Sequence, residues 1–293
     1  MILVTGATGT VGSELMKNLI QMHRSVRALV RKASDKERLQ AQGVDIVLGE
    51  LARKESVQQA LEGIDCVYLL SPSSPQLPAI EQQFAQVARE AGIKHLVKHS
   101  IIGAGDPTAS IITNWHTQGE EAIRQSGISY TFLRPNCFTQ NIVPTYSTSI
   151  KRHGVLYTML DDACISCIDV RDIADVAAQV LTQEGHAGEA YTLTGPEAIT
   201  IQQLVEKLSH LLGTQVRASK ASDEETRTAL ISLGVPDWNA DAMISLNQFY
   251  RRGGAKIVTD LVEKITGHSA RTVDEYLREN IQAFKENQPV HQT

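Results

Sequence analysis

Short apolar runs alternate with amphipathic stretches along the first half of the chain. The stretches between the runs place apolar residues three and four positions apart, which is the spacing of a helix with one buried face. The runs themselves are largely unbroken, as expected of parallel strands that are buried on both faces. They are Ile2–Val4, Val26–Val30, Val44–Leu48, Cys66–Leu70, Leu96–Ser100 and Tyr130–Leu133. This alternation predicts an α/β fold, a doubly wound Rossmann-type parallel sheet whose ligands bind beyond the carboxyl ends of the strands.

The pattern becomes less regular beyond residue 140. We expect residues 141–154 to be irregular or weakly helical, and a strand to follow at residues 165–168. Thr200 and Thr272 have the character of helix caps, so a helix is predicted to begin at each of them.

The length of the chain predicts more than one compact unit. With 293 residues, the chain exceeds the size at which a single core stops growing. We therefore predict a Rossmann domain over residues 1–184 and a smaller C-terminal α/β substrate segment over residues 185–293, with some strands free to cross the boundary.

The first apolar run leads directly into three evenly spaced glycines, Gly6, Gly9 and Gly12. Glycines at these positions let the chain turn tightly, bring backbone N–H groups close to a pyrophosphate and let the next helix pack against the strand. The spacing differs from the more familiar Gly-x-Gly-x-x-Gly, and a glycine-rich turn without a ligand is the alternative. The strand, turn, helix and strand in succession favour a dinucleotide site. The residues of this turn that we expect to contact the cofactor are Gly6, Thr8, Gly9, Thr10, Val11 and Gly12.

The second apolar run ends in Arg31 and Lys32, about 20 positions past the glycines, where the fingerprint for NAD has an acidic residue. A carboxylate there would repel the 2′-phosphate of NADP, whereas Arg31 can hold it with a bidentate, charge-assisted pair of hydrogen bonds. We therefore predict NADP(H) as the cofactor, in contact with Arg31 and Lys32. The alternative is an exposed basic pair without a ligand, and Asp35 is near enough in sequence to weaken an anion site.

Composition and charge exclude several other classes of protein. The net charge is −5, with 28 basic and 33 acidic residues interspersed, so no global field attracts nucleic acid or an anionic membrane. The sequence has no run of about 18 apolar residues, so no transmembrane helix is predicted. The first strand leaves no room for a signal peptide, so a cytoplasmic location is expected. Cys164 and Cys167 lack the second pair of ligands that a zinc site needs, and we predict no metal.

Several motifs together resemble the NmrA-like family, an atypical branch of the short-chain dehydrogenase/reductase superfamily. Besides the glycine turn and Arg31, they are Gly49-Glu50-Leu51, the run from Lys94 to Ser100, the run from Ser129 to Asn136, Asp169-Val-Arg171-Asp172 and Leu193-Thr-Gly195-Pro196. The resemblance covers essentially the whole chain. It implies a Rossmann domain with NADP(H) at its rim and a small C-terminal segment that closes a substrate cleft.

The resemblance also implies which further residues line the cofactor. Glu50 and Leu51 are expected on the adenine side, where many relatives have Asp. The end of the fourth apolar run adds Leu70, Ser71 and Pro72 to the rim. The nicotinamide side is expected to be formed by Ser100, His116, Pro135, Asn136, Cys137 and Phe138.

The chain departs from catalytic members of the superfamily at the Tyr-x-x-x-Lys dyad, in which lysine lowers the pKa of tyrosine so that the phenol can exchange a proton with substrate. The lysine position holds His116 and the tyrosine position holds Ile112. The pattern of His116 and Glu120 is similar to one in quinone and triphenylmethane reductases of the family, whose hydride transfer is thought to proceed without the dyad. His116 is the candidate catalytic residue, through a bond to the nicotinamide ribose or by supplying a proton. The alternative is a partly buried histidine that pairs with Glu120.

The predicted function is that of an NADPH-dependent reductase, which passes hydride to a planar small molecule such as a quinone. The candidate apolar walls of its cleft are Trp115, Phe138, Tyr146 and Trp238. The alternative is a non-catalytic NADP(H)-binding redox sensor that regulates partner proteins, and the missing dyad fits it equally well. Direct contact with DNA is disfavoured by the acidic balance. Neither nucleic acid nor a membrane is an expected partner, and the oligomeric state is left open.

Overall fold

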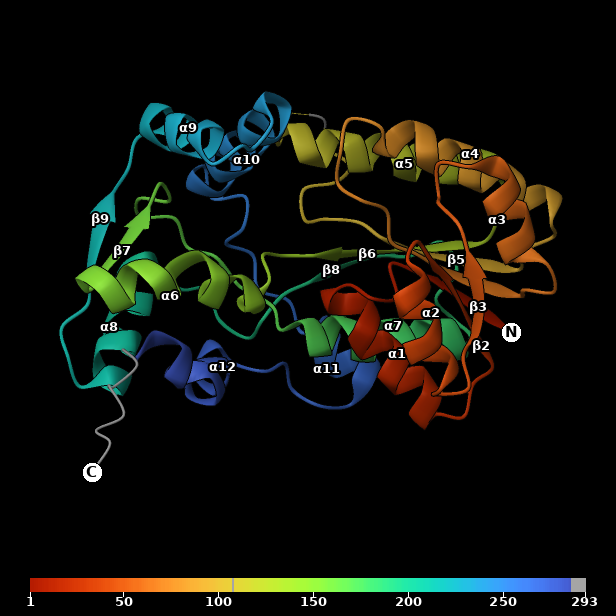
Figure 1. The fold of residues 1–293 in the computed structure, drawn as a ribbon, viewed down its shortest axis with the longest axis horizontal. Coiled ribbons are helices and arrows are strands. Elements are labelled where there is room, and N and C mark those ends of the chain that lie inside the picture. Colours follow the sequence, from red (N-terminus) through yellow and green to blue (C-terminus); the bar gives the residue numbers. More distant parts are fainter. Residues whose placement is uncertain (107, 286–293) are drawn as a thin grey trace.

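A seven-stranded sheet forms the centre of the computed structural model, which describes residues 1–106 and 108–285 (Figure 1). The strand order is β3-β2-β1-β4-β5-β6-β8, and all neighbouring strands run parallel. The strands are β1 (Ile2–Thr5), β2 (Val26–Val30), β3 (Asp45–Leu48), β4 (Cys66–Leu69), β5 (His95–His99), β6 (Tyr130–Pro135) and β8 (Ala190–Leu193). The predicted α/β fold with a doubly wound, Rossmann-type sheet is confirmed.

Helices cover both faces of the sheet (Figure 1). One face carries α3 (Lys54–Leu61), α4 (Leu77–Glu90) and α5 (Ile111–Ser126). The other carries α1 (Thr10–Gln21) and α7 (Val170–Thr182), with α11 (Leu261–Thr266) packed against α7, while α2 (Ala33–Gln40) links β2 to β3. Among the residues that the structure describes, no helix combines the length and the apolar character needed to cross a bilayer.

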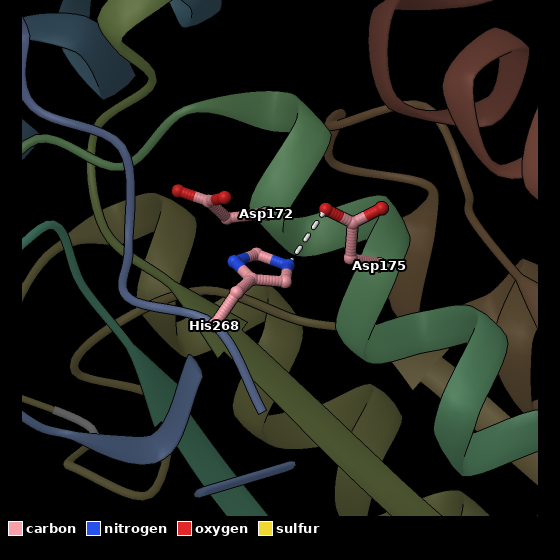
Figure 2. A group of neighbouring side chains, drawn as sticks. All are labelled: Asp172, Asp175 and His268. Atoms are coloured by element: carbon pink, nitrogen blue, oxygen red, sulfur yellow. Dashed lines mark hydrogen bonds and ion pairs between the residues drawn. The ribbon is translucent and has the colours of Figure 1, made fainter. Parts of the chain in front are cut away.

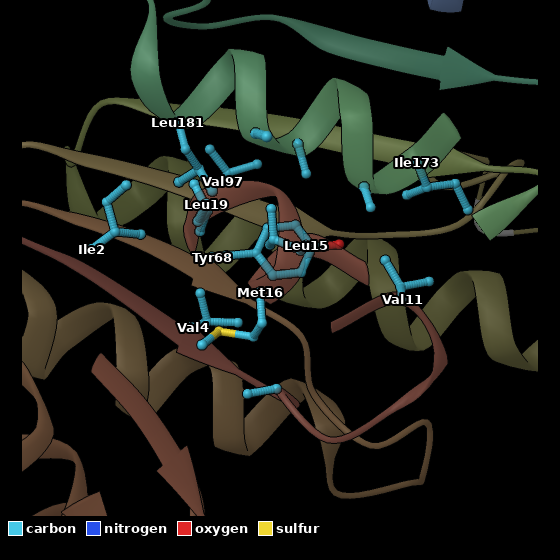
Figure 3. Packing of buried hydrophobic residues seen from close by; sticks show 14 of the residues in the cluster. Ile2, Val4, Val11, Leu15, Met16, Leu19, Tyr68, Val97, Ile173 and Leu181 are labelled. Atoms are coloured by element: carbon cyan, nitrogen blue, oxygen red, sulfur yellow. The ribbon is translucent and has the colours of Figure 1, made fainter. Parts of the chain in front are cut away.

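Alternate residues of the central strands face opposite helical layers. In β1, Ile2 and Val4 belong to the apolar cluster that includes α1 and α7, whereas Leu3 belongs to the cluster beneath α3 and α4. Figure 3 shows the first cluster, in which Leu15 of α1 packs with Tyr68 of β4. Because both faces of the sheet bury apolar side chains, the strands lack the polar alternation of a half-exposed sheet.

A second core organises the part of the molecule on the left of Figure 1, which we call the small lobe. Its elements are α6 (Ile142–His153), β7 (Val155–Thr158), α8 (Ile201–Leu212), β9 (Arg217–Lys220), α9 (Asp223–Ser232), α10 (Asp237–Arg251), α12 (Val273–Asn280) and the 3₁₀ turn Ile281–Phe284. Strands β7 and β9 pair in parallel. The buried side chains of this core include Leu156, Leu208 and Leu277. A 3₁₀ turn at Thr139–Asn141 joins β6 to α6.

The chain crosses the expected boundary at residue 184 in both directions. The small-lobe elements α6 and β7 precede this residue, whereas β8 and α11 follow it and lie with the main sheet. The division into domains at residues 1–184 and 185–293 stays a prediction.

The predicted strand at residues 165–168 is wrong. Ile165 and Ile168 each form one isolated bridge, and the two bridges join different segments of the chain. Between them, the Ser166 N–H donates to the carbonyl of Ala255 at 3.1 Å. No continuous ladder forms, because consecutive residues take their hydrogen-bond partners from separate parts of the chain.

The segment expected to be irregular or weakly helical, residues 141–154, forms the regular helix α6 over Ile142–His153. Ile150 of α6 is buried in the small-lobe core, and Gly154 ends the helix in the left-handed conformation, with φ of 64°. The serines and threonines of α6 have low helix propensity, which packing of its apolar face overrides. The helix starts predicted at Thr200 and Thr272 are confirmed, and each threonine forms a reciprocal capping box.

Candidate active site at the carboxyl edge of the sheet

The loops that follow the parallel strands meet at one edge of the sheet. Because β1 to β6 all run in the same direction, their carboxyl ends lie together. From strand to strand, this edge carries Gly6–Gly12, Arg31 and Lys32, Glu50 and Leu51, Leu70–Pro72, Ser100, and Pro135–Phe138. The rim expected from the sequence therefore exists, while contact of these residues with a cofactor stays a prediction.

The turn after β1 leaves no room for a side chain at Gly6 or at Gly12. Gly6 has a left-handed φ of 64°, and a Cβ there would lie 2.8 Å from the Leu70 side chain. A Cβ on Gly12 would lie 2.1 Å from the carbonyl oxygen of Gly6. Helix α1 begins at Thr10 without a side-chain cap, so the N–H groups of its first turn can bind an anion. The exposed residues of the turn are Thr8, Gly9 and Thr10, whereas Val11 is buried in the core.

The neighbouring loops add exposed basic and acidic groups. Arg31 and Lys32 are both exposed at the end of β2, beside the strand that leads into the glycine turn. Glu50 is exposed after β3, with its carboxylate 3.9 Å from Arg53, and Leu51 packs against the core. An exposed guanidinium next to an uncapped helix start suits a ligand with several phosphate groups.

The loop after β4 is fastened to β1. The Leu70 N–H donates to the Thr5 hydroxyl at 2.8 Å, and that hydroxyl donates back to the Leu70 carbonyl at 3.0 Å. Ser71 is buried and Pro72 is exposed. These two hydrogen bonds hold Leu70 in place, and its side chain packs against Gly6 of the glycine turn.

A buried carboxylate holds Ser100 in place after β5. The Ser100 hydroxyl donates to Oε1 of Glu120 at 2.6 Å, and the Arg134 guanidinium donates to both carboxylate oxygens, at 2.9 and 2.5 Å. Glu120 has no exposed surface. The bidentate pair with Arg134 compensates for the burial of this charge. Because the Ser100 hydrogen is committed to Glu120, its hydroxyl can only accept a hydrogen bond from a ligand.

Asn136 connects the end of β6 to the C-terminal part of the chain. Its buried amide group donates to Ser166 Oγ at 2.8 Å and to the carbonyl of Ala255 at 2.9 Å. Its Oδ1 accepts the N–H of Cys137 at 2.8 Å. The side chain is thus occupied by the protein itself, and the backbone N–H of Asn136 donates to the carbonyl of Leu193 at 2.9 Å.

His116 lies buried in the second turn of α5. Its Nδ1 is 3.4 Å from Nζ of Lys98, which forms an ion pair with Glu81. Burial lowers the pKa of His116 well below its usual range, and the charge of Lys98 acts in the same direction. The alternative expected from the sequence, a pair between His116 and Glu120, does not form, because that carboxylate binds Ser100 and Arg134.

His99 faces the opposite layer of the fold. Its Nδ1 lies 2.7 Å from the hydroxyl oxygen of Tyr68, and its ring packs edge-on against Phe138, with centroids 5.9 Å apart. Burial lowers the pKa of His99 to about 3. Lys98 and Ser100, its neighbours in sequence, bond to residues of α4 and α5. Alternation along the strand therefore turns His99 and Ser100 to opposite faces of the sheet.

The aromatic candidates for a cleft wall are distributed over several elements. Trp115 of α5 and Trp238 of α10 meet with ring centroids 6.0 Å apart. Tyr146 lies on α6 and packs against the small-lobe core. Ile112, at the position of the superfamily tyrosine, is half-buried and brings no titratable group.

Sequence reasoning missed the buried pair of Lys98 and Glu81. Both residues interrupt apolar patterns: Lys98 lies within a buried strand, and Glu81 lies four positions after Leu77 on the stripe that continues to Ala85 and Ala88. A charge at such a position is rarely buried unless it is paired. One charged residue in an apolar pattern is weak evidence for a buried ion pair. Two such residues of opposite charge, on a strand and on the helix before it, are the signal that could have identified the pair.

One group of side chains has the spacing of metal ligands, but an arginine side chain pairs with its carboxylates. Asp172, Asp175 and His268 bring their ligand atoms within 4.8 Å of one another (Figure 2). Arg271 forms ion pairs with both aspartates, and its N–H donates to Asp172 at 2.8 Å. His268 Nε2 lies 3.1 Å from Asp175. The guanidinium neutralises the carboxylates, so the cluster holds the segment before α12 against α7.

Comparison with known proteins finds relatives along the whole chain. The NmrA-like family matches residues 1–277. The chain is 35% identical to the NAD(P)H azoreductase of Xenophilus azovorans over 284 residues, which cover 97% of this chain and 99% of that protein. The structure of the NADPH-dependent quinone oxidoreductase of Escherichia coli complexed with NADPH has a TM-score of 0.89 and 27% identity, covering 96% and 100% of the two chains. The Citrobacter sp. triphenylmethane reductase complexed with NADP(H) has a TM-score of 0.85 and 27% identity, covering 95% and 99%.

These similarities confirm the resemblance that the sequence motifs carry. The match extends from the glycine turn through the small lobe, so it includes both parts of the molecule. The chain belongs to the NmrA-like family.

Proposed function

We propose that this protein is an NADPH-dependent reductase that transfers hydride to a planar, electron-poor small molecule such as a quinone. The glycine turn carries the proposal, because a Cβ at Gly6 or Gly12 would fill the space beside its backbone. The uncapped start of α1 offers N–H donors at the same place. Donors without side chains fit the diphosphate of a dinucleotide.

The basic residues after β2 support NADPH over NADH. Arg31 and Lys32 stand where a carboxylate would exclude the 2′-phosphate, and both are exposed. The similar quinone oxidoreductase and triphenylmethane reductase structures are complexes with NADPH and NADP(H). Glu50 and Leu51 would flank the adenine, and the rim from Ser100 to Phe138 would flank the nicotinamide.

The chain contributes binding, orientation and exclusion of water. When bound, NADPH supplies the hydride. Ile112 cannot act as an acid, so the proposed reaction depends on orientation of the reactants rather than on a tyrosine and lysine dyad. His116 remains the candidate for a donor near the acceptor, because its ring is neutral and buried at the rim.

The relatives support a planar small-molecule acceptor. By their names they are reductases of azo compounds, quinones and triphenylmethanes. We propose that the small lobe closes over such an acceptor, with Trp115 and Trp238 as candidate apolar walls where α5 meets α10. The regulatory alternative is not favoured, because these similar proteins are reductases. A cytoplasmic location stays a prediction from the sequence.

Oxidation of NADPH in the presence of different acceptors tests the proposal. The purified protein is supplied with NADPH and with a panel of quinones, azo dyes and triarylmethane dyes, and the NADPH absorbance is followed. We expect turnover with at least one acceptor class and slower turnover with NADH. Absence of turnover across the panel, together with binding of a partner protein that changes with NADP⁺, would favour the sensor instead.

A further inference from the structure

A fully buried lysine lies beside the histidine of the candidate active site. Lys98 of β5 and Glu81 of α4 form an ion pair in which neither side chain has exposed surface. Gly119 provides the space for this pair, because a Cβ there would clash with the Glu81 carboxylate. The lysine Nζ also lies 3.4 Å from Nδ1 of His116. A buried ion pair adds little stability compared with an apolar pair of similar size, so stability alone does not account for it.

The contact with Lys98 determines which nitrogen of His116 carries a hydrogen. An ammonium group can only donate hydrogen bonds, so Nδ1 of His116 is the acceptor. The single hydrogen of the neutral ring therefore lies on Nε2. Within residues 1–106 and 108–285, the hydrogen bond of the His116 ring is made by Nδ1, which leaves Nε2 as a donor for a ligand.

His116 is also placed at the rim. Helix α5 connects two parallel strands, so it runs back from the carboxyl edge of the sheet and its first turns lie at that edge. His116 precedes Glu120 by one turn, and Glu120 binds Ser100 directly after β5. His116 therefore lies near the edge where the acceptor is proposed to bind.

We propose that Lys98, held by Glu81, is a positioning residue that fixes His116 as an Nε2–H donor and resupplies its proton. This inference rests on the proposed function. Hydride supplied by bound NADPH leaves an acceptor such as an azo compound with one negative charge. His116 gives its Nε2 proton to that anion while Lys98 gives a proton to Nδ1. The acceptor has then gained a hydride and a proton, His116 is a neutral Nδ1–H ring and Lys98 is an amine. Nδ1 returns its proton to Lys98 as Nε2 takes one proton from solvent, which restores the ammonium group and the Nε2–H ring.

The other charged and titratable groups around this pair are engaged elsewhere. Glu120 is bonded to Ser100 and to Arg134, and the ring of His99 is bonded to the hydroxyl of Tyr68. Among the described residues, Lys98 is the hydrogen-bond partner of the His116 ring. The other titratable groups that act on Glu81 or on His116 are Glu120 of α5 and His99 of β5.

The first test uses the protein without cofactor. Nitrogen-15 NMR of the imidazole rings distinguishes Nε2–H from Nδ1–H, and His116→Asn identifies the signal. We expect an Nε2–H ring in the wild type. In Lys98→Met/Glu81→Met, which leaves no unpaired buried charge, the Nδ1 signal should move to the position of a nitrogen without a hydrogen bond. An Nδ1–H ring in the wild type, or an Nδ1 signal that does not move in the double variant, would overturn the inference.

The second test compares acceptors that differ in their need for a proton. An azo compound becomes an anion when it takes hydride, whereas a triarylmethane cation becomes a neutral product and needs no proton. For the double variant we expect kcat with the azo compound to fall by about a hundredfold, within the range of general acid catalysis. Its kcat with the cation and its Kd for NADPH should stay near the wild-type values.

The outcomes separate the inference from the proposed function. Equal losses with both acceptors would indicate a structural role, and no loss with either would remove the role of Lys98, so both results contradict the inference. Lys94→Met is the matched control, because Lys94 is exposed, pairs with Asp65 and should not affect either activity when replaced. If the wild type reduces no acceptor, the proposed function fails, and the Nδ1 signal decides separately whether Lys98 positions His116.

Discussion

Gly12 lies so close to Gly6 that a methyl group on it would come within 2.1 Å of the Gly6 carbonyl oxygen. We expect Gly12→Ala to lower the free energy of unfolding by roughly 2 kcal/mol, because α1 must move away from β1 to relieve the overlap. The same movement should abolish NADPH binding, since it displaces the start of the helix. Chemical denaturation and a fluorescence titration with NADPH measure the two effects.

Gly9→Ala is the matched control for that variant. Its Cβ would lie 3.3 Å from the Gly6 oxygen, a tight contact that a small shift relieves, so stability should remain near that of the wild type. The affinity for NADPH should still fall, because the added methyl group crowds the exposed backbone to which we assign the diphosphate. If Gly9→Ala binds NADPH as the wild type does, the cofactor does not lie on this turn.

Arg31 should determine the preference between the two nicotinamide cofactors. We expect Arg31→Ala to weaken NADPH binding by roughly ten- to a hundredfold, the value of a charge-assisted hydrogen bond, and to leave NADH binding unchanged. Titrations with both cofactors measure the ratio. Lys17→Ala removes an equal charge from an exposed position of α1 and should leave the preference intact. An unchanged preference in Arg31→Ala would assign the 2′-phosphate to other residues.

The cluster of Asp172, Asp175 and His268 should behave as an ion-pair network. We expect EDTA to leave the Tm unchanged, because Arg271 already neutralises the two carboxylates. Arg271→Met should lower the free energy of unfolding by about 3 kcal/mol, since it leaves Asp172 buried without its partner. Zinc should not restore the loss. Stabilisation of this variant by zinc, but not of the control Arg278→Met, would instead indicate a metal site.

Stability should fall as the solution becomes acidic. Between pH 6.5 and about 3, the unfolded chain binds a proton at His99 that the folded chain does not bind. The free energy of unfolding therefore decreases with falling pH in this window, by at most about 1.4 kcal/mol per pH unit for one such group. The pKa of buried His116 is lowered too, so it adds to the loss.

His99→Gln separates the two contributions and retains a polar group beside Tyr68. The decrease in unfolding free energy from pH 6.5 to 5 should be smaller than in the wild type by about 1.6 kcal/mol. Denaturation curves at the two pH values measure it. The same decrease in both proteins would show that His99 is able to take up a proton in the folded state.

The parts of the fold that local patterns determine could be predicted from the sequence. The strands β1 to β6 are short apolar runs, and the turn between Gly6 and Gly12 combines its residue types with its place after a strand. Helix α6 could not be predicted in this way, because its stability comes from packing of Ile150 in a core shared with distant segments. The strand expected at residues 165–168 failed for a related reason, since its hydrogen bonds go to separate parts of the chain.

The residues of the candidate site also fall into those that local sequence patterns place and those that depend on contacts with distant segments. Residues at the ends of strands, such as Ser100, can be placed by topology alone. Lys98 and Glu81 meet across 17 positions of sequence, and whether two charges are buried together depends on how α4 sits over β5. The direction of a side chain is equally non-local, as Asn136 shows by turning to Ser166 rather than to the rim.

The small lobe is built from three separate stretches of the chain. The chain enters the small lobe with α6, again with α8 and again with α12, and returns to the main sheet with α7 and with α11. No single cut removes the lobe without also removing a strand or helix of the main sheet. Exchange of one contiguous gene segment therefore cannot replace the whole lobe and leave the main sheet unchanged.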